Sequence, residues 1–235
     1  MIKNLLLFLH ILLISNLFSQ EKYSLEALTG LGGIELVGDV IKLQKDTYEA
    51  FQKMQNAARK DGIEIKIVSG YRSFKSQKSI WNRKYNKYIS QGLSPRQAIE
   101  KIIEYSTIPG TSRHHWGTDI DVIDGLVPIP KSILYEKNYA ENGIYSKLKK
   151  WMDKNSERYG FYLVYNSNIE RKGFKYEPWH YSYKPLSGIM LKEYKEIDLK
   201  KFYAKFKPKG FLYFNAGFLN KYFQENIMDI NPSLQ

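Results

Sequence analysis

Three of the four histidines in this chain lie in two short segments that also carry carboxylates and a tryptophan. His114 and His115 lie in residues 109–121, and His180 lies in residues 176–181. Two imidazoles and one carboxylate suffice for a catalytic zinc ion, which keeps its fourth position for water. The chain has no cysteine, so any metal ligands must be His, Asp or Glu. A single histidine beside a tryptophan is usually structural, but this clustering favours a metal site.

Glu177 could serve such a site as a general base. Zinc lowers the pKa of a bound water toward about 7, and a free carboxylate can then take the proton and pass it to the leaving amine. Glu177 lies three residues before His180, with Pro178 between them. Because proline disfavours a helix interior, this spacing differs from the helical His-Glu-x-x-His arrangement. We expect an irregular strand or turn to bring both side chains to the metal.

A third segment, residues 68–77, places Arg72 between a predicted strand and a predicted helix. A guanidinium held at such a turn could bind a carboxylate through two parallel hydrogen bonds or stabilise an oxyanion. Taken alone, an arginine of this kind is usually an ordinary surface residue. Arg72 is therefore a candidate site residue only when it is considered together with the two histidine segments.

The elements that must position these segments do not follow a regular βαβ order, which favours an α+β fold. Residues 63–68 alternate apolar and polar side chains, the pattern of a strand. Ser94 and Gln97 form a capping box with Pro95 at the first helical position. The expected helices span about 46–60, 73–90, 94–105 and 144–158, and Asp46 is a possible N-cap of the first. The expected strands span about 63–68, 118–123, 161–165 and 176–183. Residues 107–116 and 125–142 are expected to be loops.

Taken in order, the three chemical segments resemble a known family. Ser69-Gly-Tyr-Arg72-Ser with Gln77 is followed by Ser112-x-His-x-x-Gly-x-x-x-Asp121 and then by Glu177-Pro-Trp-His180. This set is similar to that of the VanY-type D-alanyl-D-alanine carboxypeptidases, relatives of the D-Ala-D-Ala dipeptidases. The resemblance covers roughly residues 45–185. The three motifs together are far more specific than any one of them alone.

The resemblance implies one zinc ion per chain with three protein ligands, His114, Asp121 and His180. It implies that Glu177 is the catalytic base and that Arg72 contacts the substrate or the tetrahedral intermediate. Ser112 and Gln77 would lie at the substrate. It also implies a compact α+β fold with a central antiparallel sheet flanked by helices and the zinc in a groove across the sheet. The expected activity is hydrolysis of the terminal D-Ala peptide bond of peptidoglycan stem peptides.

Two positions allow more than one interpretation. Asp119 and Asp121 alternate with Ile120, which would put both carboxylates on one strand face. Many members of the resembled family have a small residue where Asp119 stands. Asp119 could orient a ligand histidine or compete as the ligand, although the spacing from His114 to Asp121 matches the family. His115 is one residue out of register and is expected in the pocket or at the surface.

The first 19 residues have the order of a secretory signal peptide. Lys3 supplies a positive charge, residues 5–14 are apolar apart from His10, and Ser19 offers a cleavage site before Gln20. The apolar run is shorter than the ~20 residues that span a bilayer. We therefore expect cleavage rather than a membrane anchor, no transmembrane segment in the mature chain, and an exported protein that is periplasmic or secreted.

The chain is basic, with a formal net charge of +12. In an exported protein this charge suggests attraction to anionic envelope polymers or lipid headgroups, and export argues against nucleic acid. A lysine-rich surface that serves only solubility would look the same. We expect a catalytic domain over residues 20–190 and a basic, aromatic-rich extension over residues 191–235 that packs on it.

Three other functions fit parts of this pattern. A peptidoglycan endopeptidase would use the same metal and base on an internal bond. A non-catalytic cell-wall-binding module would carry a structural metal, but such a site closes its fourth position and needs no spare base, so Glu177 disfavours it. A basic protein that binds membrane surfaces would leave the His, Asp and Glu set unexplained. The zinc carboxypeptidase is the function we expect.

Overall fold

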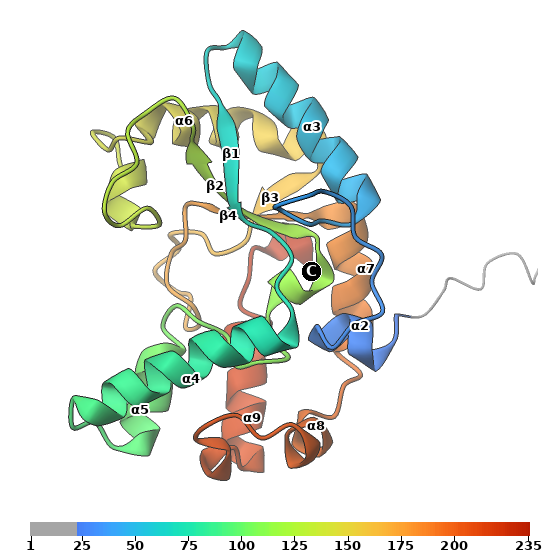
Figure 1. Cartoon of the computed structure of the whole chain (residues 1–235), viewed down its shortest axis with the longest axis vertical. Helices are drawn as coiled ribbons and strands as arrows, with labels where there is room; N and C mark the ends of the chain where they lie inside the picture. Colours follow the sequence, from blue (N-terminus) through green and yellow to red (C-terminus); the bar gives the residue numbers. More distant parts are fainter. Residues whose placement is uncertain (1–22) are drawn as a thin grey trace, which may run out of the picture.

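The computed structural model describes residues 23–235, and the predicted signal peptide at residues 1–19 lies outside this range. A four-stranded antiparallel sheet of order β1-β2-β4-β3 lies in the upper half of the molecule as drawn in Figure 1. Its strands are β1 (Ile65–Ser69), β2 (Asp119–Asp124), β3 (Phe161–Leu163) and β4 (His180–Tyr183). Helices flank the sheet, so the predicted α+β class with a central antiparallel sheet is confirmed.

The central strand β2 is buried along its whole length. Its apolar residues Ile120, Val122 and Ile123 belong to one hydrophobic cluster with residues of helices α3 (Lys45–Lys60) and α6 (Ser146–Asn155). Such β-branched side chains fit the pleated surface of a packed sheet. β2 pairs with β1 on one side and with β4 on the other. Strand pairing therefore joins the two histidine segments directly.

The ends of α3 and α6 show how local sequence sets helix boundaries. Gln44, not the predicted Asp46, is the N-cap of α3 and makes no side-chain capping hydrogen bond. Asp46 lies instead in the first turn, where its negative charge complements the helix dipole. A 3-10 turn, Ser156–Tyr159, follows α6 and ends at Gly160, whose φ of 81° favours glycine.

The lower half of the molecule in Figure 1 is mainly helical. A second hydrophobic cluster takes side chains from six helices, α2 (Leu25–Thr29), α4 (Phe74–Ser90), α5 (Pro95–Ile102), α7 (Lys184–Tyr194), α8 (Leu199–Lys205) and α9 (Ala216–Tyr222). The predicted capping box of Ser94 and Gln97 is present at the start of α5. Within residues 23–235, no helix is both long and apolar enough to cross a membrane.

The C-terminal residues 191–235 are part of this second cluster rather than a tail. Buried Phe202, Tyr203 and Tyr222 pack in it together with Trp81 of α4. The indole N–H of Trp81 also donates to the carbonyl oxygen of Lys209 at 2.9 Å. Two 3-10 turns, Phe211–Tyr213 and Pro232–Leu234, and a π-helical segment, Phe223–Ile227, complete this region.

The strands on the His180 side are shorter than the sequence predicts. β3 and β4 replace the predicted strands at 161–165 and 176–183. Residues 177–180 form a turn in which the N–H of His180 donates to the carbonyl of Glu177 at 3.1 Å. The N–H of Glu177 donates to the carbonyl of Tyr165, also at 3.1 Å. The expected irregular turn between Glu177 and His180 is therefore present. On the other side, Arg113–Trp116 forms a 3-10 turn within the predicted loop.

Candidate metal centre

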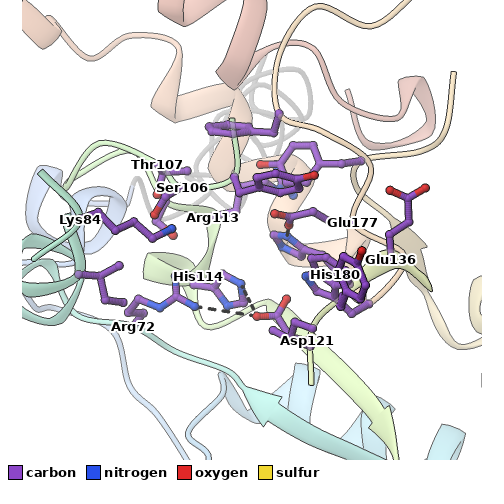
Figure 2. Close-up of a pocket in the computed structure, with 18 residues that line it drawn as sticks. Arg72, Lys84, Ser106, Thr107, Arg113, His114, Asp121, Glu136, Glu177 and His180 are labelled. Carbon is purple, nitrogen blue, oxygen red and sulfur yellow. Dashed lines mark hydrogen bonds and ion pairs between the residues drawn. The ribbon is translucent and has the colours of Figure 1, made fainter. Parts of the chain in front are cut away.

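Strand pairing and a tight turn bring the three predicted metal ligands together. Asp121 and His180 are register partners across β2 and β4, and His114 lies in the 3-10 turn that precedes β2. One possible ligand atom from each residue lies within 4.8 Å of the others, and all three residues are buried. The two imidazole rings stack with centroids 4.7 Å apart. Figure 2 shows the three side chains gathered at one place in a pocket.

The backbone selects the tautomer of His114. Its Nδ1 lies 2.9 Å from the carbonyl oxygen of Gly70, and a carbonyl only accepts hydrogen bonds, so Nδ1 carries the proton. In the neutral ring, the form that binds a metal ion, Nε2 is then the free nitrogen, and it lies 3.4 Å from Oδ2 of Asp121. A neutral imidazole with a free Nε2 lone pair, oriented through its other nitrogen, is suited to hold a metal ion.

Asp121 is a carboxylate with one oxygen left unpaired. Its Oδ1 is buried and has no hydrogen-bond partner among the described residues, and its Oδ2 lies 3.9 Å from Nη2 of Arg72. Burial disfavours the charged form, yet nearby His114, His180 and Arg72 hold the pKa of Asp121 below its usual value. A buried, ionised oxygen without a partner is costly unless a cation lies beside it. Asp121 therefore fits the role of a metal ligand.

His180 lies between two carboxylates. Its Nε2 is 2.8 Å from Oδ2 of Asp119, and its Nδ1 is 3.0 Å from Oε2 of Glu177. Burial disfavours the imidazolium, but the hydrogen bonds with Asp119 and Glu177 raise the pKa of His180 to about 10. Because Asp119 occupies Nε2, Nδ1 is the nitrogen that could face a metal ion, which would take the place of the Nδ1 proton.

Asp119 is fully buried and its oxygens are saturated with hydrogen bonds. Besides its contact with His180, it accepts from Nε of Arg113 at 3.1 Å, from Oγ of Ser182 at 2.6 Å and from Oγ1 of Thr118 at 3.0 Å. Asp119 does not belong to the cluster of possible metal ligands, whereas Asp121 does. Of the two interpretations that the sequence allows, the geometry favours Asp119 as the residue that orients His180.

His115 lies neither in the pocket nor at the surface, so that prediction was wrong. Its side chain is fully buried, with Nδ1 2.5 Å from the carbonyl oxygen of Arg72 and Nε2 accepting from the N–H of Gly110 at 3.1 Å. Burial lowers the pKa of His115 to about 3, so the ring is neutral and Nδ1 donates. His115 thus ties the backbone at Arg72 to the loop that leads to His114.

The cluster opens into a cavity of about 480 Å³. Arg72, Ser112 and Glu177 line it, as expected for residues near a substrate. Gln77 was also predicted to bind substrate, but it does not line the cavity and its side chain is fully buried. Its Oε1 accepts from Nη1 of Arg72 at 3.0 Å, and its Nε2 donates to the carbonyl of Thr107 at 2.8 Å. Gln77 therefore holds Arg72 in place instead of reaching the cavity.

The cavity also contains charged residues that the sequence motifs do not single out. Lys84 of α4 and Glu136 line it, and Figure 2 shows Lys84 extending toward the cavity on the same side as Arg72. The signal that could have found Lys84 is its helical spacing. Residues 77, 80 and 84 are separated by three and four positions, which places them on one helix face.

Comparisons with known proteins point to one family. A family model described as VanY, D-alanyl-D-alanine carboxypeptidase, matches residues 40–186. A D-alanyl-D-alanine carboxypeptidase of Enterococcus faecalis is 30% identical over 167 residues, which cover 67% of this chain and 56% of that protein. The putative carboxypeptidase YodJ of Bacillus subtilis is 28% identical over 166 residues, which cover 70% of this chain and 55% of that protein. The chain thus spans about half the length of these curated relatives.

Two solved structures share the fold. VanYB in complex with D-alanine-D-alanine superposes with a TM-score of 0.54 at 24% identity, over 75% of this chain and 91% of that one. A mutant of the vancomycin resistance D,D-pentapeptidase VanY, from a VanB-type cassette and in complex with Zn(II), superposes with a TM-score of 0.52 at 25% identity, over 72% and 89%. Since the family model matches more than half of the residues and the predicted motifs lie within the match, the chain belongs to the VanY family of D-alanyl-D-alanine carboxypeptidases.

Proposed function

We propose that the protein is a zinc-dependent carboxypeptidase that hydrolyses the terminal D-Ala peptide bond of peptidoglycan stem peptides. The observation that carries this proposal is the convergence of His114, Asp121 and His180 within 4.8 Å in a cavity that also contains Glu177. The family supports a peptidase. The finer assignments of metal, base and bond rest on the chemistry of the side chains.

Zinc suits this set of ligands. Two imidazoles and one carboxylate form a common catalytic zinc site with one open position, and the unpaired Oδ1 of Asp121 is left for a cation. The VanY structure that contains Zn(II) is a relative with the same fold. When bound in such a site, zinc supplies Lewis acidity that polarises a carbonyl group and makes water more acidic.

The surrounding residues have the remaining roles in catalysis and substrate binding. Glu177 is the carboxylate that takes a proton from the attacking water and passes it to the leaving amine. Arg72 is held by Gln77 and by Oγ of Ser69, the latter at 2.8 Å, so its guanidinium is already oriented before a substrate arrives. A fixed cation of this kind stabilises the negative charge that develops on the carbonyl oxygen or on a nearby carboxylate. Ser112 lines the same cavity and is placed to contact the substrate.

The presence of Glu177 separates an enzyme from a metal-stabilised binding module. A structural zinc site is closed by four protein ligands, whereas this cluster has three and opens into a cavity. Glu177 lies beside His180, with its Oε2 3.0 Å from Nδ1, and it lines the cavity, whereas Asp119 and His115 do not. The arrangement therefore supports hydrolysis over a purely structural metal.

The direct test is cleavage of defined stem peptides by the purified protein. Tetrapeptide and pentapeptide stems are incubated with zinc-loaded protein, with chelator-treated protein and with the His180→Ala variant, and the products are identified by mass. We expect loss of one D-Ala from at least one stem, with activity abolished by chelation and restored by zinc. Metal analysis should show about one zinc ion per chain, reduced in His180→Ala. Internal cleavage only, or full activity without metal, would contradict the proposal.

We further infer that the protein acts outside the cytoplasmic membrane, where peptidoglycan stem peptides are located. The signal-like pattern of residues 1–19 and the net charge of +12 support this location, since the cell envelope is rich in anionic polymers. Sequencing of the N-terminus of the exported protein should begin near Gln20. A membrane-bound form that keeps residues 1–19 would contradict cleavage.

A further inference from the structure

The wall of the cavity formed by α4 carries a lysine with no partner. Lys84 lies on the same helix face as Ile80, and both line the cavity. Lys84 is half-buried, and no hydrogen bond or ion pair joins its ammonium group to any other residue in the range 23–235. The arginines that line the cavity, Arg72 and Arg113, both have such partners, and so does His180. Lys84 is therefore the cavity cation that is free to bind a ligand.

The electrostatics of this position favour the binding of an anionic ligand. Burial lowers the pKa of Lys84, and the positive charges of Arg72 and two other basic residues of α4 lower it further, against the attraction of Glu177. Lysine side chains usually leave such surroundings and extend into water. Figure 2 shows Lys84 instead extending toward the cavity. A ligand carboxylate beside it would offset the cost of partial burial.

Arg72 is placed for a different task. Its Nη1 and Nη2 are held by Gln77 and Ser69, and Nη2 lies 3.9 Å from Oδ2 of Asp121. The guanidinium is thus beside a proposed metal ligand, where the carbonyl oxygen of the scissile bond must also lie. Lys84 extends into the cavity from the same side as Arg72. Its position on α4 is almost two helical turns beyond Gln77. The two cations are therefore placed to contact two different anionic groups of one substrate.

We propose that the ammonium of Lys84 binds the C-terminal carboxylate of the stem peptide and that Arg72 faces the oxygen of the scissile carbonyl. This assignment rests on the proposed function. In a carboxypeptidase substrate these two groups are separated by a single residue, and both carry or develop negative charge. An ammonium binds a carboxylate as a compact point charge, through a charge-assisted hydrogen bond. Lys84 would then be the residue that makes the enzyme prefer a free chain end.

The test compares a stem pentapeptide with a free C-terminal acid with the same peptide ending in an amide. Hydrolysis of both is measured for the unmodified protein, Lys84→Met and Arg72→Met. Binding of both is measured by calorimetry in a Glu177→Gln background, which holds the peptide without cutting it. Lys87→Met is the matched control, because Lys87 is an exposed lysine of the same helix and does not line the cavity.

We expect Lys84→Met to raise KM for the acid about 10- to 100-fold, as for loss of one charge-assisted contact, with little change in kcat. The preference for acid over amide should collapse in both the hydrolysis and the binding assays. Arg72→Met should lower kcat and leave most of the preference. Lys84→Arg, which keeps the charge, should retain part of the preference. Lys87→Met should behave as the unmodified protein.

Three results would overturn the assignment. In the first, Lys84→Met keeps the full preference for the acid while Arg72→Met loses it, so that Arg72 binds the chain end. In the second, Lys84→Met weakens binding and hydrolysis of the acid and the amide equally, and it does so only for stems that contain meso-diaminopimelate instead of L-Lys. Lys84 would then bind a side-chain carboxylate. In the third, the unmodified protein neither binds nor cuts any stem peptide, which overturns the proposed function and this assignment with it.

Discussion

Nε2 of His180 lies 2.8 Å from Oδ2 of Asp119, a carboxylate that is fully buried and also bound by Arg113. This contact occupies Nε2 of the imidazole, so Nδ1, which lies 3.0 Å from Oε2 of Glu177, is the nitrogen that a metal ion could use. Strand pairing keeps the two residues together, because Asp119 pairs with Ser182 and Asp121 pairs with His180 across β2 and β4. Asp119 thus positions a candidate metal ligand, and it lies outside the cluster of possible ligands itself.

Replacing Asp119 with Asn should weaken metal binding. The amide cannot hold His180 with the same charge, and loss of an outer partner of a metal-binding histidine typically costs about 10- to 100-fold in metal affinity or activity. Competition with a chelator would measure the affinity of Asp119→Asn against the unmodified protein. Asp121→Asn is the comparison variant and should lose far more affinity. Equal losses in the two variants would assign both carboxylates to the metal itself.

Glu177→Gln should bind zinc but lose most turnover. The amide cannot accept a proton from water, and loss of a general base commonly costs about 10²- to 10⁴-fold in rate. Zinc content and stem-peptide hydrolysis are measured on the same preparation. Glu177→Asp keeps a carboxylate and should retain more activity than the amide. A zinc-replete Glu177→Gln protein with near-normal turnover would contradict the assignment of the base.

Tyr222→Phe should loosen the loop that leads to the metal centre. The hydroxyl of Tyr222 accepts from the N–H of Ile108 at 3.1 Å and lies 2.8 Å from Oγ1 of Thr111. Without it, the buried N–H of Ile108 loses its partner, which costs about 1–3 kcal/mol of unfolding free energy. Urea unfolding measures this loss. We also expect lower kcat/KM, because Ser112 directly follows the loosened loop.

The control for Tyr222→Phe comes from the same C-terminal region. Tyr213→Phe removes the hydroxyl of a tyrosine that is 44% exposed, so its stability and activity should be close to those of the unmodified protein. Two further hydroxyls act on the same loop, since Tyr194 donates to the carbonyl of Gly110 at 2.8 Å and Tyr203 to that of Pro109 at 3.0 Å. If Tyr222→Phe is as stable and active as Tyr213→Phe, the hydroxyl of Tyr222 does not position this loop.

Buried His115 should make stability fall in mild acid. The pKa of His115 is about 3 in the folded chain, against an ordinary value of 6.5. Between these two pH values the unfolded chain therefore binds a proton more readily than the folded chain does. The stabilisation is fully present above pH 6.5 and decreases as the pH falls toward 3, by up to about 1.4 kcal/mol per pH unit. His115→Asn keeps a donor toward the carbonyl of Arg72 but does not titrate.

Urea unfolding of the chelator-treated proteins at pH 7, 6 and 5 measures this effect. Other titrating groups contribute to both curves, so the difference between the unmodified protein and His115→Asn isolates His115. We expect that difference to shrink as the pH falls, because the unmodified protein loses stability faster. Parallel curves for the two proteins would show that His115 is not buried as a neutral ring.

The sequence by itself indicated a candidate metal site and determined much of the local structure. Histidine and carboxylate types in the order His114, Asp121, Glu177 and His180 are enough to indicate zinc chemistry, because few side chains bind that metal. Ser94 and Gln97 cap α5 as predicted, and Gly160 ends the helical segment after α6. Such features depend on a few neighbouring residues, so they can be recognised without knowing what packs against them.

Only the tertiary structure distinguished the roles of candidate residues that lie close together in the sequence. Asp119 and Asp121 share a strand face, and the partners brought by β4 and by Arg113 distinguish them. His115 became a buried bridge because a distant backbone carbonyl, at Arg72, lies against its ring. Lys84 lines the cavity from a position of α4 outside the motifs, and Tyr222 of α9 contacts the loop that precedes Ser112. Their positions depend on contacts between residues far apart in the chain, and those contacts form only when the sheet and the helical cluster pack together.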